Sequence, residues 1–188
     1  MSTSLISAVE HERETWATKV SDLVELTKPR IMSMVLVTVV VAAFIATKGH
    51  PSLILLVHTI IGTALVAGSG SVLNQWIERD LDKRMDRTAN RPIPSGKVSP
   101  TEAFLFGLIL GLSGVAYLVP ATNFSAACWA GLTWLLYVVV YTPLKQVTSW
   151  NTAVGAVPGA LPVIIAWVGV GEALDWTAFG LVTCFKGV

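Results

Sequence analysis

The chain has 188 residues, of which 53% are hydrophobic and 13% are charged, and its mean hydropathy is +0.66. Soluble domains carry about 25% charged residues, so this composition excludes an ordinary soluble domain and indicates a membrane protein. The formal net charge of +1 says little, because six of the thirteen Lys and Arg residues are concentrated between Arg79 and Lys97. We expect a lipid bilayer around the protein and no nucleic-acid partner.

Residues 1–28 are polar and mix acids with bases, so we expect a cytoplasmic N-terminal segment without a signal peptide. One transmembrane domain is expected over residues 29–188. Its first apolar run covers 31–47, and Pro29 suits the first turn of a helix, where its missing N–H is not needed. Lys28 and Arg30 flank this start either as interfacial anchors or as groups that face a ligand, and both interpretations stay open.

Further apolar runs predict an all-α, polytopic bundle of transmembrane helices, at 52–77, 103–119, 124–141 and 152–170. Small residues from Ala67 to Ser71 indicate close helix packing in the second run. Ser99, Pro100 and Glu102 predict a capped start for the third. A sixth run begins at Trp176 but is much shorter than the roughly 20 residues of a span. We therefore expect about five full spans, a partial sixth, and a domain that is incomplete at its C-terminus.

The basic residues of short loops predict the orientation, because such residues are concentrated on the cytoplasmic side. If the spans alternate, the N-terminal segment, the loop at 79–97 and Lys145 share one side. Lys48, Glu172 and Asp175 then share the other side. We expect a multi-pass protein of the cytoplasmic (inner) membrane with its N-terminus in the cytoplasm.

The charged stretch after the second run carries the strongest chemical signal. Asn74, Glu78, Asp82 and Asp86 are four residues apart, so on a helix they form one polar stripe. Charged groups at the end of an apolar helix are unfavourable unless they face a ligand or solvent. Carboxylates at this spacing can bind a divalent cation, and Mg²⁺ is usually held by one or two carboxylates together with phosphate oxygens.

Basic residues follow the acidic stripe. Arg87 and Arg91 can pair with phosphate oxygens in a bidentate geometry. Acids for a metal, bases for phosphate and an apolar bundle behind them suggest a diphosphate attached to a lipid tail. The alternative is a cytoplasmic loop with incidental ion pairs, the common explanation of charge in a membrane loop. His58 is the only histidine within an apolar run, and we interpret it as a hydrogen-bonded interior residue.

Several short motifs occur in a characteristic order between residues 26 and 170. They are Leu26-Thr27-Lys28-Pro29-Arg30, the stretch from Asn74 to Pro92, Tyr141-Thr142-Pro143-Leu144-Lys145 with Thr148 and Asn151, and Gly159-Ala160-Leu161-Pro162 with Trp167. In this order the motifs resemble the protoheme IX farnesyltransferase (haem O synthase) family, within the superfamily of intramembrane aromatic prenyltransferases.

The resemblance implies a helix bundle around a central cavity, in which a farnesyl group passes from farnesyl diphosphate to a vinyl group of haem B. It implies Mg²⁺ on Asn74, Glu78 and Asp82. The basic positions that match the family's diphosphate contacts are Arg30, Arg87, Arg91 and Lys145. Tyr141 matches an aromatic position at the cavity mouth and, with Lys145 and the metal-binding residues, completes the implied catalytic set. The implied partners are a haem O-using synthase or oxidase assembly proteins.

The chain departs from the family pattern at two points. Glu78 stands where aspartate is commoner, although the carboxylate is kept. The second aspartate-rich motif of the superfamily does not occur before Val188, so we expect the 188-residue chain alone to be weakly active or inactive. Two alternatives stay open: a prenyltransferase for a quinone precursor or chlorophyllide, and a non-catalytic haem-handling protein, which would need an intramembrane His or Met pair as axial ligands.

Overall fold

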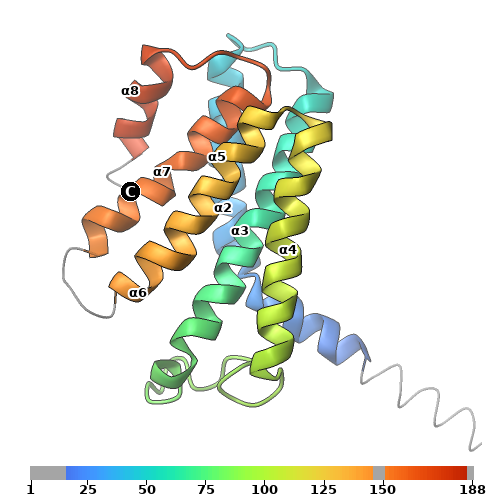
Figure 1. Ribbon diagram of the computed structural model, residues 1–188, viewed down its shortest axis with the longest axis vertical. Coiled ribbons are helices and arrows are strands. Elements are labelled where there is room, and N and C mark those ends of the chain that lie inside the picture. Colours follow the sequence, from blue (N-terminus) through green and yellow to red (C-terminus); the bar gives the residue numbers. More distant parts are fainter. Residues whose placement is uncertain (1–15, 146–150, 186–188) are drawn as a thin grey trace, which may run out of the picture.

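The computed structural model describes residues 16–145 and 151–185, and within these ranges the chain is helical without a strand. A helix over residues 16–26 is followed by α2 (Pro29–Ala46), α3 (Leu53–Asp82), α4 (Pro100–Ala121) and α5 (Phe124–Leu135). The π-helix η1 (Leu136–Tyr141) and the short α6 (Thr142–Leu144) continue α5, and α7 (Asn151–Gly169) and α8 (Trp176–Phe185) complete the chain. Figure 1 shows the long helices side by side as one bundle, which confirms the predicted all-α architecture.

The helix lengths agree with a multi-pass membrane protein. Within the described residues, α2, α3, α4 and the continuous helix Phe124–Leu144 are long and apolar enough to cross a bilayer. Helix α7 has 19 residues, close to the roughly 20 that a span needs, whereas α8 has 10. The protein is therefore a multi-pass membrane protein, and the short sixth run is confirmed as a short helix.

The start of α4 shows how the sequence fixes a helix boundary. The hydroxyl of Ser99 accepts a hydrogen bond from the N–H of Glu102, and the Glu102 carboxylate accepts one from the N–H of Ser99. Pro100 occupies the first helical turn. This reciprocal capping satisfies two N–H groups that the helix leaves unpaired, so the predicted capped start is confirmed.

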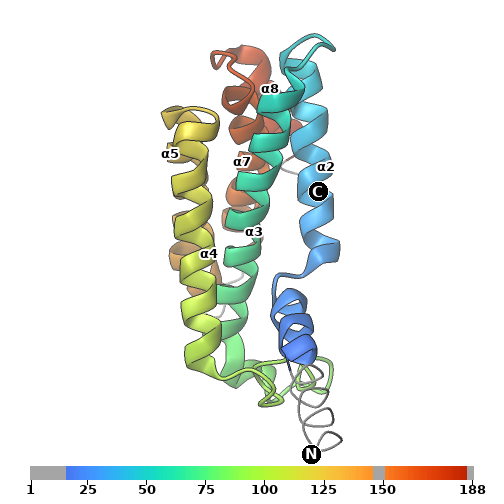
Figure 2. The ribbon, with the colours of Figure 1, turned by 90° about the vertical axis from the view of Figure 1, so that its right-hand side faces the viewer.

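Helices α3 and α4 pack closely along their length, as Figure 2 shows. Ser69 of α3 donates a hydrogen bond to the Gly107 carbonyl of α4 at 2.5 Å, and it accepts one from Trp134 Nε1 of α5 at 2.8 Å. A Cβ added at Gly111 would lie only 2.6 Å from Ser69 Oγ. The glycines on α4 and the small residues on α3 therefore permit the close approach that the stretch from Ala67 to Ser71 predicted.

The expected grouping of the polar segments at two ends of the bundle is also present. The helix over 16–26, the loop after α3 and the end of α6 lie at one end, and the turn after α2 lies at the other (Figures 1 and 2). Leu26 is fully buried in a cluster with Val72, Ile93, Val98 and Ala103. This cluster joins the N-terminal segment, α3, the charged loop and α4, so it fixes the positions of the charged residues that surround it.

Candidate functional site

Three members of the predicted acidic stripe lie on the last turns of α3. Asn74, Glu78 and Asp82 are buried, with exposed fractions of 4%, 8% and 4%. Successive members are about 6 Å apart along the helix axis. The prediction was wrong for Asp86, because α3 ends at Asp82 and the chain then turns. The Thr88 hydroxyl donates a hydrogen bond to the Asp82 carbonyl at 2.9 Å, and Asp86 is exposed on the turn.

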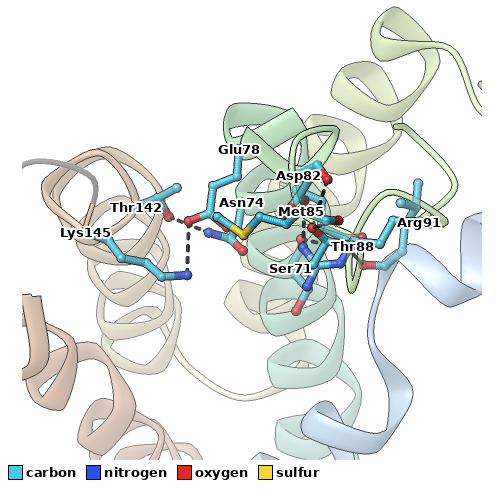
Figure 3. Close-up of polar contacts among 11 residues, drawn as sticks. Ser71, Asn74, Glu78, Asp82, Met85, Thr88, Arg91, Thr142 and Lys145 are labelled. Atoms are coloured by element: carbon cyan, nitrogen blue, oxygen red, sulfur yellow. Dashed lines mark hydrogen bonds and ion pairs between the residues drawn. The ribbon is translucent and has the colours of Figure 1, made fainter. Parts of the chain in front are cut away.

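Each buried carboxylate of the stripe is paired with a cation from another segment. Lys145 Nζ lies 3.1 Å from Glu78 Oε1, and Arg91 Nη1 lies 2.7 Å from Asp82 Oδ2. Figure 3 shows the two cations reaching the stripe from opposite sides, Lys145 from the end of α6 and Arg91 from the loop. Buried charges require such compensation, so the pairs explain how two carboxylates are accommodated at the end of an apolar helix.

The amide of Asn74 is also oriented. Its Nδ2 donates to the Thr142 hydroxyl at 3.4 Å, and that fully buried hydroxyl donates to the Tyr137 carbonyl at 2.8 Å. This hydrogen bond uses the amide nitrogen, so the amide oxygen is the atom of Asn74 that could act as a ligand. Thr142 therefore supports the site, a role that sequence reasoning did not assign to it.

The loop between α3 and α4 is compact, which fixes the place of Arg91. The Arg91 N–H donates to the Thr88 carbonyl at 3.1 Å, and the Ser95 hydroxyl donates to the Arg91 carbonyl at 2.7 Å. Ile93 and Val98 are buried in the cluster that also contains Leu26. The prolines and glycine that predicted an end to the helix here thus also allow a folded loop.

Lys28 is a further cation, at the start of α2. It is half-buried just before α2, and burial is the main cause that lowers the pKa of its ammonium group. Repulsion from Arg91 and, more weakly, from Lys145 lowers this pKa further, whereas Glu78 and Asp82 raise it. The sequence had left open whether Lys28 anchors the helix or faces a ligand.

Arg30, the second residue of α2, and Arg87, in the loop after α3, are exposed. Neither side chain makes an ion pair within the described part of the chain. The structure therefore brings together Asn74, Glu78 and Asp82 with their two paired cations, and it leaves these two arginines exposed. Thr148 lies outside the described residues, and so does the side chain of Asn151.

A largely apolar cavity of about 210 Å³ begins next to the stripe. Ser71, three residues before Asn74 on α3, lines it, and so does Tyr141, four residues before Lys145. The cavity extends along α3 as far as Thr63, about 12 Å from Ser71 along the helix axis. Thr63 Oγ1 is buried there without a hydrogen-bond partner in the described structure.

Aromatic side chains form one wall of this cavity: Trp134, Tyr137 and Tyr141. The rings of Tyr137 and Tyr141 lie 5.4 Å apart, and Gly155 of α7 makes room for Tyr141, since a Cβ there would lie 2.5 Å from its ring. Both tyrosines belong to the π-helical segment η1. Segments of this kind are rare and occur often at functional sites. The sequence predicted an unbroken helix here and gave no signal for the change.

His58 has one ring nitrogen in a hydrogen bond within the bundle. Its Nδ1 lies 2.6 Å from the Tyr117 hydroxyl across the α3–α4 contact. The predicted interior, hydrogen-bonded role is confirmed.

Residues 35–185 match the UbiA prenyltransferase family. The chain belongs to the UbiA prenyltransferase family. A protoheme IX farnesyltransferase of Rhodopirellula baltica is 44% identical over 168 residues, which cover 87% of this chain and 58% of the relative. One of Gloeobacter violaceus is 38% identical over 182 residues, which cover 96% of this chain and 60% of the relative. The chain thus spans little more than half the length of these curated relatives.

A solved structure described as that of digeranylgeranylglyceryl phosphate synthase has the same fold. It superposes with a TM-score of 0.79 at 17% sequence identity and covers 89% of this chain and 58% of that one. At this identity the likeness concerns the fold alone. It confirms the fold of the helix bundle.

UbiA prenyltransferases generally depend on divalent cations, so we tested the stripe against such an ion. The described residues contain no group of three or more His, Cys, Asp or Glu side chains that could hold a metal by themselves. The stripe offers two carboxylates and one amide oxygen, which is the set expected for an ion that completes its coordination with phosphate oxygens. The residues therefore fit a cation that binds together with a phosphate-bearing ligand.

Proposed function

We propose that this UbiA-family protein transfers a farnesyl group from farnesyl diphosphate to a vinyl group of haem B, which yields haem O. Relatives named protoheme IX farnesyltransferase at 38–44% identity support this acceptor and donor. The observation that carries the proposal is the position of the buried stripe, with its paired cations, at the end of an apolar, aromatic-walled cavity. An amphiphile with a diphosphate head and an isoprenoid tail matches both parts of this arrangement.

The head group would lie at the stripe. Asn74, Glu78 and Asp82 would hold Mg²⁺, which supplies Lewis-acid stabilisation of the diphosphate oxygens. Arg91 and Lys145 lie 2.7 and 3.1 Å from the two carboxylates, so they would be close enough to pair with the oxygens of a diphosphate bound at the stripe. The exposed arginines, Arg30 and Arg87, are the further diphosphate contacts implied by the family pattern, and they stay predictions.

The tail would lie in the largely apolar cavity. When the bond between the allylic carbon and the diphosphate oxygen breaks, its electron pair leaves with the diphosphate and positive charge develops on the allylic carbon. The faces of Tyr137 and Tyr141 can stabilise this charge, and the apolar lining keeps water from capturing it. The outer carbon of the vinyl group then forms the new carbon–carbon bond, which leaves the positive charge on the vinyl carbon attached to the porphyrin ring. Water adds to that carbon and loses a proton, which gives the hydroxyl group. No nucleophilic side chain is needed.

We further propose that the protein lies in the cytoplasmic (inner) membrane with its N-terminus and the stripe on the cytoplasmic side. The concentration of Lys and Arg in the loop after α3 supports this orientation. The product would pass to a haem O-using synthase or to proteins of oxidase assembly.

Binding and product analysis test the proposal. The purified chain in lipid discs should bind farnesyl diphosphate in the presence of Mg²⁺ and much more weakly after the metal is removed with EDTA. Membranes supplied with farnesyl diphosphate and haem B should be analysed for haem O by mass spectrometry, with hydroxybenzoate as the competing acceptor. Prenylation of hydroxybenzoate but not of haem would show that the acceptor is wrong. Absence of metal-dependent farnesyl diphosphate binding would overturn the whole assignment.

A further inference from the structure

The helix over residues 16–26 has an apolar face that the bundle does not cover. Trp16, Val20 and Val24 are four residues apart, so they lie on one face of this helix. They are 64%, 56% and 50% exposed. Three large apolar side chains exposed together are unfavourable in water, so this apolar face requires an apolar environment.

A second face of the same helix is fixed to the bundle. Lys19 Nζ lies 3.4 Å from Glu102 Oε1 of α4, and the buried Asp22 lies 3.9 Å from Lys97 Nζ of the loop after α3. Leu26 is fully buried in the cluster that joins α3, this loop and α4. The bundle therefore determines how the helix is rotated about its own axis.

The third face is polar, with Ser21 and Glu25 exposed on it. Because a helix advances by about 100° per residue, the three faces are roughly a third of a turn apart. One face meets protein, one is apolar and one is polar. A helix that lies in the plane of a membrane interface beside transmembrane spans needs this division, because it contacts the spans, lipid and water at once.

The path of the chain places this helix where the spans end. Lys28 has a φ of 51° and a ψ of 65°, and this left-handed residue redirects the chain between the helix and α2. Figures 1 and 2 show the helix at the end of the bundle, turned away from the direction of the long helices. On α2, which can span a bilayer, Met34 and Val37 are 66% and 62% exposed, so lipid-facing residues follow a few positions later.

Aromatic and basic side chains mark the same level on α3 and α4. The guanidinium carbon of Arg79 lies 5.0 Å from the centre of the Trp76 ring, and that ring lies 4.8 Å from the ring of Phe104. Tryptophan is enriched where spans meet the membrane–water interface. Trp76 packs against the same buried cluster as Leu23 of the helix over 16–26. The helix is therefore held at the depth of the interface.

We propose that the helix over 16–26 lies in the membrane interface and inserts its apolar face between the lipid headgroups and the upper acyl chains. The partner of this face is lipid, and the polar face with Ser21 and Glu25 is in water. The proposal goes beyond the reaction proposed above and does not depend on it. Because Asp22 pairs with Lys97, the same helix connects the bilayer to the loop that carries Arg91.

Spin labels at two adjacent positions test this placement. Val20→Cys and Ser21→Cys are each made in the full chain with Cys128→Ser and Cys184→Ser, because both native cysteines are exposed and would also take up the label. The labelled proteins are placed in phosphatidylcholine discs that hold one copy each. Electron paramagnetic resonance then measures collisions of the label with oxygen, which is concentrated among acyl chains, and with a water-soluble nickel chelate.

We expect the ratio of oxygen to nickel collisions to be several-fold higher at position 20 than at position 21. Ser21→Cys is the matched control, because positions 20 and 21 are both exposed and differ only in the face that they occupy. Trp16→Phe gives a second measurement that needs no label. The emission that disappears in Trp16→Phe, which belongs to Trp16, should be quenched in discs of phosphatidylcholine brominated near the head of the acyl chain.

Three results would overturn the proposal. Equal collision ratios, with nickel reaching both labels, would show that the apolar face is in water. Few collisions with either reagent at position 20 would show that protein covers it, and dipolar broadening at higher loading would identify a second copy of the chain. Trp16 emission that brominated lipid does not quench would also exclude the interface, and this measurement decides alone if Val20→Cys lowers the thermal midpoint.

Discussion

In the Asp82–Arg91 pair, we expect the arginine to matter more for stability and the aspartate to matter more for metal-dependent binding. Asp82 and Arg91 meet at 2.7 Å, but the side chains are 5% and 23% exposed. Asp82→Asn leaves a guanidinium that still reaches water and an amide oxygen that can accept its hydrogen bond, so we expect a loss of about 2 kcal/mol in the free energy of unfolding. Arg91→Gln leaves a buried carboxylate without its cation, for which we expect a loss of about 3–5 kcal/mol.

For binding of farnesyl diphosphate, Asp82→Asn should have the larger effect and Arg91→Gln the smaller one. If Asp82 ligates the cation, Asp82→Asn removes the Mg²⁺-dependent part of the affinity for farnesyl diphosphate. In Arg91→Gln the ion itself compensates the freed carboxylate, so Mg²⁺ with farnesyl diphosphate should restore much of the lost stability. Thermal unfolding in detergent, with and without Mg²⁺ and farnesyl diphosphate, measures both quantities on the same samples.

The double variant Asp82→Asn/Arg91→Gln serves as the control for a structural role. If the pair is only structural, the double variant recovers stability and both single variants lose ligand binding in proportion to their loss of stability. Metal-dependent binding that survives in Asp82→Asn would refute the assignment of this carboxylate to the cation.

Three other substitutions test the packing that positions the site. Gly111→Val should destabilise the bundle by about 1–3 kcal/mol, because the new side chain would meet Ser69 Oγ; an unchanged thermal midpoint would show that α4 can move away. Ser99→Ala should cost about 1 kcal/mol through loss of the capping bond to Glu102, measured in the same assay, and an equal effect of a distant surface Ser→Ala would contradict this explanation. Thr63→Val should raise stability by about 1 kcal/mol, because it removes a buried hydroxyl without a partner; a loss instead would show that the hydroxyl binds a water molecule or ligand.

Much of the site was predictable because its members are local in sequence. The spacing of Asn74, Glu78 and Asp82 places them on one face of any helix, whatever surrounds it. The same reasoning included Asp86 and was wrong, because the end of α3 depends on the Thr88 hydroxyl returning to the Asp82 carbonyl. Where a helix stops after a charged run is decided by such side-chain contacts, which periodicity does not contain.

The partners of the stripe could not be derived from spacing. Lys145 is 67 positions from Glu78, so only the packing of α5 and η1 against α3 brings the two together. The family resemblance had placed Lys145 and Arg91 among the basic positions, and the structure shows the carboxylate that each one meets. It also joins the segment before α2 to α3 through the hydrogen bond from Gln75 to the Leu26 carbonyl, a contact between residues 49 positions apart.

The sequence by itself determined that this is an all-helical membrane protein with an acidic stripe at the end of its second span. Hydropathy, helical periodicity and the Ser99 cap are local properties, and the bilayer enforces them, because it leaves every span to satisfy its own backbone hydrogen bonds. Only the tertiary structure decided which cation meets which carboxylate, that the helix before α6 becomes a π-helix, and that an aromatic-walled cavity begins where the stripe ends. These features depend on side chains of separate helices that meet in a region of low dielectric constant. A buried charge without a partner is strongly unfavourable there, so the packing must bring an opposite charge to it.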